Sequence, residues 1–428
     1  MITRLWQRGQ SIPRNMRLFL LNVLAYGMVI DGILSVLLNL YLLRLGYDTT
    51  FIGTINSIGT LVFALVSLPI GAVQRYSSRQ MMQLGQFLSL IGLLGVPLAL
   101  YVNEGQALFL IGFRVVASIG LSTYFVHQVP LVMEITRPAW HARALSLTMA
   151  FFSLAAFLGS WIGGMLPGFF GGLLTLPLTD PQPYQLTMFA AALLLIPAMI
   201  AIRLLPDRPV GEETPAEETN HGTLAAGWKP LAGLLAVILL VRALQSGGIG
   251  VVMTFTNVYL DEALMVPTSR IGLITGFGRL LGVPMSLTVP WLVSRFGNFK
   301  LVHLSLGLIA LLILPLALVP YWPVAALAVI GISSMGSVRY LSFIGFTMAL
   351  VSDKQRSLIS GTNEMAIGAG FAISSFIGGY LIAWLGYREL FLFGSALTVL
   401  GTVVFGLIFW RRSGQTARPA PIPRAPKL

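Results

Sequence analysis

The hydrophobic residues of this chain gather in twelve runs, which short polar segments separate into two sets of six. A helix that crosses the ~30 Å hydrocarbon core of a membrane needs ~20 apolar residues, because its backbone can hydrogen-bond only to itself there. The runs of the first set are Leu18–Tyr41, Phe51–Val73, Met81–Tyr101, Ala107–Met133, Ala144–Pro167 and Tyr184–Leu205. Those of the second set are Leu231–Leu260, Ile271–Val293, Leu301–Val319, Val324–Val351, Ile359–Leu385 and Leu390–Trp410. The pattern predicts an all-α membrane protein with 12 transmembrane helices in two six-helix bundles.

Polar segments divide the chain into five parts. Residues 206–230 are rich in Pro, Gly and Glu and carry few apolar side chains, which is typical of a flexible linker between bundles. The other predicted parts are a basic N-terminal tail (1–17), the N-terminal bundle (18–205), the C-terminal bundle (231–410) and a basic, Pro-rich tail (411–428).

Composition and charge support a membrane protein and orient it. The chain is 56% hydrophobic and 10% charged, which is more apolar surface than a soluble fold can bury. The net charge of +12 could indicate a nucleic-acid partner, but most of the 27 Lys and Arg residues lie in the tails and in loops on one side of the membrane. Such an excess marks the cytoplasmic side, and an even number of spans places both termini there. We therefore predict a multi-pass protein of the cell (cytoplasmic or inner) membrane with cytoplasmic N- and C-termini and no nucleic-acid partner.

Enzyme chemistry finds no support in the sequence. Without cysteine the chain has no disulfide and no thiolate ligand, and no nucleotide-binding or hydrolase motif is present. No cofactor and no metal site are predicted, and the energy for any transport must come from a gradient of ions or of the solute itself.

The two sets of spans repeat one another. The segment Asn39–Tyr41 aligns with Asn257–Tyr259, and Gly53 aligns with Gly272. Because both halves begin and end in the cytoplasm, the repeat is parallel, with a pseudo-two-fold axis along the membrane normal. This arrangement is typical of transporters that bind a solute between two bundles.

The loop between the second and third spans, Gly71-Ala-Val-Gln-Arg75-Tyr-Ser-Ser-Arg79, resembles the G-x-x-x-D-R-x-G-R signature of the major facilitator superfamily, with Gln74 in place of the Asp. The resemblance to this superfamily covers residues 18–410. The resemblance implies that this loop, together with acid–arginine pairs in other loops, closes the cytoplasmic side. The alternative is that these pairs are ordinary solvent-exposed loop charges with no gating role. The implied cytoplasmic gate consists of Gly71, Arg75, Arg79, Arg295, the pair Glu134 and Arg143, and the pair Asp353 and Arg356.

Two further motifs resemble particular members of the superfamily. The segment Arg114–Gly120 resembles the Arg-containing motif of proton-coupled members, and Gly159–Gly164 resembles the G-P-x-x-G-G motif of drug/proton antiporters, with Ser160 in place of Pro. These resemblances imply proton-coupled export. Close helix packing through small residues is the alternative for the glycines.

Ionisable side chains inside the spans are the strongest functional candidates, because a charge near the bilayer centre costs roughly 3 kcal/mol or more. Helical spacing places Asp31 on a stripe with Asn39, and the helix rise puts Arg114 within about 5 Å of it in depth. We predict an Asp31–Arg114 pair that either couples transport to protons or only fixes helix packing. The six ionisable side chains are Asp31, Arg114, Arg242, Arg279, Arg339 and Glu364.

The second bundle supplies four of these charges. Arg242, on a stripe with Gln245, and Arg339 could hold an anionic group of the substrate or pair across the bundle. Glu364 could neutralise Arg339 or be a second titrating site. Arg279 lies on a stripe of small residues and is interpreted as structural.

These observations favour a secondary transporter that works as a monomer in the lipid bilayer by alternating access. The predicted activity is export of a small amphipathic molecule in exchange for protons. The predicted substrate- and proton-binding residues are Asp31, Arg114, Arg242, Arg339, Glu364, Asn39 and Gln245. Uptake or uniport of an organic anion is the alternative that the basic excess favours. A membrane sensor that binds without translocating and a lipid flippase are the remaining alternatives.

Overall fold

The computed structural model describes residues 12–71, 75–137, 140–206, 232–351 and 355–410, which form helices and no strand. The N-terminal half contains α2 (Arg14–Gly27), η1 (Met28–Leu34), α3 (Ser35–Arg44), α4 (Thr49–Gly71), α5 (Ser78–Leu98), η2 (Ala99–Tyr101), α6 (Gln106–Ile135), α7 (His141–Leu174) and α8 (Gln182–Arg203). The C-terminal half contains α10 (Ala232–Glu262), α11 (Thr268–Leu318), α12 (Trp322–Met348), α13 (Arg356–Leu385) and α14 (Tyr387–Phe409). Residues 1–11 of the predicted N-terminal tail, most of the predicted linker and the predicted C-terminal tail lie outside the described residues, and α2 begins at Arg14, within the predicted N-terminal tail.

Eleven helices in the described part of the chain are long and apolar enough to cross a membrane. The first of them joins α2, η1 and α3 into one span. The 51-residue α11 holds two crossing segments, because Gly297 leaves the helical conformation with φ 74° and ψ 157°. A positive φ is readily adopted by glycine, which has no Cβ. The predicted all-α architecture is confirmed, and the division of α11 is consistent with twelve crossings.

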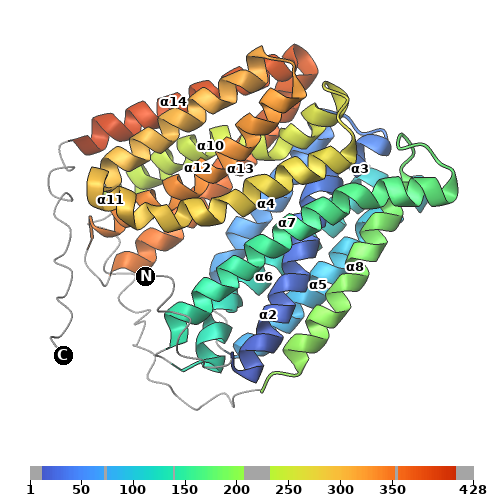
Figure 1. Cartoon of the computed structure of the whole chain (residues 1–428), viewed down its shortest axis with the longest axis horizontal. Coiled ribbons are helices and arrows are strands. Elements are labelled where there is room, and N and C mark those ends of the chain that lie inside the picture. The colour runs from blue at the N-terminus through green and yellow to red at the C-terminus, as the bar shows by residue number, and fades with distance from the viewer. Residues whose placement is uncertain (1–11, 72–74, 138–139, 207–231, 352–354, 411–428) are drawn as a thin grey trace.

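The helices form two bundles, α2 to α8 and α10 to α14, which diverge toward one side of the molecule (Figure 1). We call this the tail side, because α2 and α10 begin there and α8 and α14 end there. The opposite side is the far side. The bundles meet through α4 with α13 and through α7 with α11. The tail-side ends of the two bundles therefore lie farther apart than their far-side ends (Figure 1).

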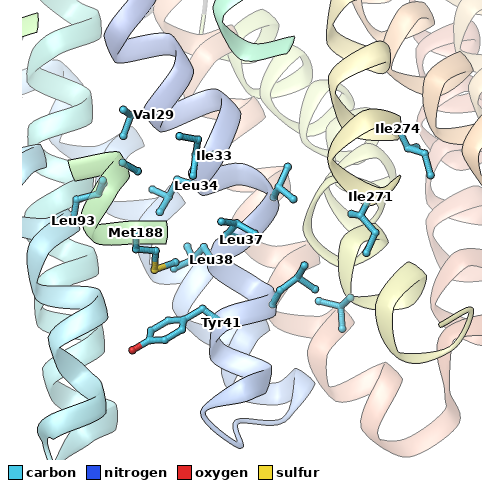
Figure 2. Packing of buried hydrophobic residues seen from close by; sticks show 14 of the residues in the cluster. Val29, Ile33, Leu34, Leu37, Leu38, Tyr41, Leu93, Met188, Ile271 and Ile274 are labelled. Carbon is cyan, nitrogen blue, oxygen red and sulfur yellow. The ribbon is translucent and has the colours of Figure 1, made fainter. Parts of the chain in front are cut away.

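Apolar packing joins the bundles toward the far side. Figure 2 shows side chains of η1 and α3 lying between Leu93 and Met188 of their own bundle and Ile271 and Ile274 of α11. A second buried cluster, centred on aromatic side chains such as Phe343, fills the tail-side half of the C-terminal bundle. Between helices in a membrane such contacts stabilise mainly by close van der Waals packing.

Glycines set the closest approaches between the bundles, and they occur in symmetric positions. A Cβ on Gly53 of α4 would overlap the carbonyl oxygen of Ser375 on α13. A Cβ on Gly272 of α11 would likewise overlap the carbonyl oxygen of Ser160 on α7. Only residues without a side chain let helix backbones approach so closely. The internal repeat read from the sequence thus appears as two equivalent helix crossings.

Candidate functional site

Reciprocal hydrogen bonds join the first helices of the two bundles. The Asn39 side-chain amide donates to the carbonyl oxygen of Thr254 (2.7 Å), and the Asn257 amide donates to the carbonyl oxygen of Ser35 (2.9 Å). Each asparagine oxygen also accepts a hydrogen bond from the second span of its own bundle. The structure therefore places Asn39, a predicted solute-binding residue, in the contact between the bundles.

An ion pair connects the bundles at the far end of these helices. The Arg44 guanidinium donates from Nη2 to both carboxylate oxygens of Asp261, at 2.8 and 2.7 Å, and from Nε to the carbonyl oxygen of Leu178 at 2.8 Å. The Arg44 guanidinium also lies 5.4 Å from the ring of Tyr184, whose hydroxyl hydrogen-bonds to that of Thr268 (3.0 Å). These contacts close the far side of the space between the bundles.

Weakening this ion pair should open the far side. We expect Asp261→Asn to raise the population of far-side-open molecules about tenfold, because hydrogen bonds between charged groups stabilise by about 1.5–3 kcal/mol. The natural chain has no cysteine. A Ser333→Cys background therefore offers one thiol to a membrane-impermeant maleimide added from the far side. Faster labelling is expected with Asp261→Asn and not with Glu104→Gln, which removes an exposed far-side carboxylate. Equal labelling rates in the two variants would contradict the role of this ion pair.

A central cavity of about 310 Å³ lies between the bundles on the tail side of these contacts. Its wall carries mostly small and polar side chains from α10, α11 and α12, together with residues of the first span and α7. Asp31 from η1 and Arg279 from α11 line it and form an ion pair with each other. Their side chains stay 35% and 25% exposed. Arg279 follows the start of α11 at Thr268 by about 16 Å of helix rise, which places the ion pair near mid-depth.

The predicted Asp31–Arg114 pair is wrong. Arg114 belongs to α6 and lies across Gly59 of α4, since a Cβ on Gly59 would be 2.5 Å from the Arg114 Nε. Its side chain therefore stays within the N-terminal bundle. Arg279, interpreted from the sequence as structural, is the partner of Asp31.

The local backbone explains why Asp31 faces the other bundle. Residues Met28–Leu34 form a π-helix, which changes the direction of side chains relative to a regular α-helix and often occurs at functional sites. Gly32 packs on α7, where its Cβ would lie 2.5 Å from the Cα of Gly159. The glycines of the antiporter-like motif thus hold η1 against α7 and position Asp31.

A second group of charges lies inside the C-terminal bundle. Arg242 is fully buried, with its guanidinium 4.5 Å from the ring of Phe343 and 5.6 Å from that of Tyr340. The Tyr340 hydroxyl donates to Glu364 Oε1 (2.8 Å), and the Glu364 carboxylate acts electrostatically on both Arg242 and Arg339. The predicted residues Arg242, Arg339 and Glu364 are therefore brought together by the fold.

Gln245 has a different environment from the one predicted. It is fully buried, and a Cβ on Gly401 of α14 would lie 3.1 Å from its Cγ. Its side chain thus packs inside the C-terminal bundle and does not line the central cavity.

The predicted gate residues in the loop after α4 lie on the tail side. Gly71 ends α4, and both Gly71 and Arg75 are exposed. The Arg79 guanidinium donates to the carbonyl oxygens of Arg203 (3.1 Å) and Leu205 (2.7 Å), which belong to its own bundle. Arg79, in the first turn of α5, therefore makes these contacts within its own bundle in this state.

The other gate candidates also contact neighbours in their own bundle. Glu134 accepts a hydrogen bond from the Ser78 hydroxyl, and the Arg143 guanidinium lies 4.5 Å from the Trp140 ring. The Arg295 guanidinium lies 5.9 Å from the ring of Trp291 and 5.8 Å from that of Phe296, both on its own helix. Asp353 and the side chain of Arg356 lie outside what the structure describes. Because the bundles diverge on the tail side, the gating role of all these residues stays a prediction.

The comparisons with known proteins identify the family. The model of the Major Facilitator Superfamily matches residues 18–351 and 337–428. The chain belongs to the major facilitator superfamily. No protein in a search of curated sequences matches it.

Solved structures with a similar fold align with nearly the whole chain. A bacterial homologue of the human lysosomal transporter Spinster, in an inward-facing and unoccupied conformation, matches with a TM-score of 0.76 and 14% identity, over 96% of this chain and 100% of that one. The nucleoside transporter NupG matches with a TM-score of 0.74 and 15% identity, over 92% and 98%. A D-xylose-proton symporter matches with a TM-score of 0.70 and 12% identity, over 92% and 96%. At these identities the likeness shows the fold alone.

The protein is therefore a multi-pass membrane transporter of the major facilitator superfamily. Its two bundles enclose a cavity at mid-depth, and an ion pair of one residue from each bundle lies on the cavity wall. The described part of the chain contains no group of three or more His, Asp or Glu side chains that could hold a metal ion.

Proposed function

We propose that the protein is a proton-coupled secondary transporter that exports a small amphipathic molecule by alternating access. In this proposal the central cavity binds the solute, and the Asp31–Arg279 ion pair couples its movement to protons. The observation that carries the proposal is that this ion pair joins the two bundles at mid-depth while both side chains stay partly exposed to the cavity.

The chemistry of the ion pair supports coupling. Protonation of Asp31 removes its negative charge and with it the attraction to Arg279, which weakens one contact between the bundles. Arg279 is then left in the cavity as a partly exposed charge without this partner. A bound proton and a bound solute can therefore favour different arrangements of the bundles, which is the requirement for coupled transport.

In the proposed orientation the tail side is cytoplasmic. The excess of Lys and Arg in the tails and tail-side loops supports this assignment, with the protein in the cell membrane and acting as a monomer. The described conformation would then be inward-facing, since the far-side contacts are made and the bundles diverge on the tail side. The similar bacterial homologue of Spinster is also inward-facing.

The direction of transport rests on the resemblance of Gly159–Gly164 and Arg114–Gly120 to antiporter and proton-coupled motifs. Uptake of an organic anion is the second candidate. It is favoured by the two buried guanidinium groups of Arg242 and Arg339, which share one nearby carboxylate, that of Glu364.

Flux under an imposed pH gradient tests the proposal. A solute would first be chosen by comparing growth inhibition and metabolite accumulation in cells with and without the protein. In proteoliposomes we expect an imposed proton gradient to drive this solute in the direction opposite to the protons. Without an imposed gradient, solute added outside the liposomes should enter them and drive protons out. Movement of solute and protons in the same direction would support uptake instead. Flux that ignores the pH gradient would rule out proton coupling, and binding without counterflow would indicate a sensor.

A further inference from the structure

The C-terminal bundle contains buried guanidinium nitrogens without partners. Arg242 is 0% and Arg339 5% exposed. Three nitrogens of Arg242 and two of Arg339 have no hydrogen-bond partner among the residues that the structure describes. A buried cation is strongly unfavourable unless an opposite charge and hydrogen-bond acceptors satisfy it. The guanidinium groups of Arg242 and Arg339 therefore lack hydrogen-bond acceptors for these nitrogens in the described structure.

More donors lie on the same two helices. Ser246 is one turn from Arg242 on α10, Ser342 is about one turn from Arg339 on α12, and both hydroxyls are buried without a partner in the described structure. Arg242 is about 15 Å of helix rise from the tail-side end of α10, and Arg339 about 14 Å from that of α12. The two guanidinium groups therefore lie at one depth, with Ser246 about 6 Å farther from the tail side and Ser342 about 4 Å nearer to it. Guanidinium and hydroxyl groups are donors that bind carboxylate and phosphate.

Tyr340 and Glu364 cover these guanidinium groups from the space between the bundles. The Tyr340 ring lies over Arg242, and its hydroxyl donates to Glu364. Glu364 is exposed and lies one turn on the tail side of Gly368, where a Cβ would be 2.7 Å from Ala64 of the other bundle. This face of α13 is therefore directed at the N-terminal bundle.

We infer that Arg242 and Arg339 form a binding site for a small anionic group, a carboxylate or a phosphate, which enters from the space between the bundles past the Tyr340–Glu364 hydrogen bond. The inference rests on the proposed function, because that space is the proposed solute path. The Glu364 carboxylate balances one of the two guanidinium charges. A single negative charge on the ligand balances the other.

Binding of a charged probe and its neutral analogue tests the site. The full-length protein in lipid nanodiscs is titrated with benzoate and with benzamide at constant ionic strength, and each dissociation constant is measured calorimetrically. Benzoate should bind and benzamide should not, because only benzoate carries the charge. Arg242→Gln should weaken benzoate binding about tenfold or more.

The Glu364→Gln variant separates this site from a general attraction of anions. It should bind benzoate several-fold more tightly, because it removes a negative charge that competes for the same guanidinium groups. Arg388→Gln, which removes an exposed arginine of α14, should leave the affinity unchanged. Equal binding of benzoate and benzamide, or benzoate affinity unchanged by Glu364→Gln, would overturn the inference even if Arg242→Gln does not fold.

Two further arms complete the design. Inorganic phosphate is titrated alone and in the presence of benzoate. Binding of phosphate alone indicates that the site accepts a free anion. Competition with benzoate indicates that the charged group of an organic solute can occupy the same site. Benzoate affinity is measured without a pH gradient, and pH-driven solute flux is measured separately. The anion site and the proton coupling can therefore fail independently.

Discussion

Replacing Asp31 with asparagine should reduce pH-driven solute flux to the level of liposomes without protein, a loss of about 100-fold or more, because the position can no longer exchange a proton. The side chain keeps its size and can still hydrogen-bond to Arg279, so folding should be preserved. Counterflow of solute without a pH gradient should persist, since exchange needs no net proton movement. The measurement is flux in proteoliposomes with and without an imposed gradient.

Two controls separate coupling from damage to the fold. Glu104→Gln removes an exposed far-side carboxylate and should leave flux at the wild-type level. The exchanged pair Asp31→Arg with Arg279→Asp restores the ion pair between the bundles and should retain more coupling than either single substitution. Undiminished gradient-driven transport by Asp31→Asn would end the proposed role of Asp31.

The architecture could be predicted from hydropathy because a membrane demands long apolar helices and leaves little freedom in their length. The sequence placed a boundary between the eighth and ninth spans, and the structure keeps both within α11 around Gly297. The repeat was also visible in advance. Asn39 and Asn257, aligned from the sequence, make equivalent bonds across the bundle contact.

The pairing of charges could not be predicted in the same way. Helical spacing assumes 100° per residue, whereas the π-helix around Asp31 changes that angle. Which span Asp31 faces also depends on how one bundle packs on the other, and spacing within a helix carries no information on that. Gln245 was misplaced for a related reason. Its helix is buried on nearly all sides, so a polar stripe does not identify the face that lines the cavity.

The sequence carries a signal for the far-side ion pair. Arg44 and Asp261 follow the equivalent residues Asn39 and Asn257 near the ends of the two helices. Opposite charges at equivalent ends of helices that meet on a pseudo-two-fold axis are placed to contact each other. Both residues lie at or beyond the ends of the apolar runs, where a charge costs little, so the cost of burial does not single them out.

Adding one methyl group at either bundle crossing should shift the transporter away from the described state. Gly53→Ala would press a Cβ onto the backbone of Ser375, and Gly272→Ala would do so at Ser160. Overpacking of this kind costs typically about 1–3 kcal/mol. The ratio of far-side-closed to far-side-open molecules should therefore fall by about fivefold to more than a hundredfold, since about 1.4 kcal/mol corresponds to a factor of ten.

Because the bundles move as units about the cavity, opening the far side should bring their tail-side ends together. Spin labels at Tyr76→Cys and Phe296→Cys, both exposed and in different bundles, can be introduced directly, since the natural chain has no cysteine. Double electron–electron resonance should show the distance between the labels shortening with Gly53→Ala, and again with Gly272→Ala, because the two crossings are equivalent. Gly168→Ala is the matched control on α7, where an added Cβ meets nothing within 4 Å. If the control shortened the distance as much as Gly53→Ala does, helix propensity rather than the crossing would determine the state.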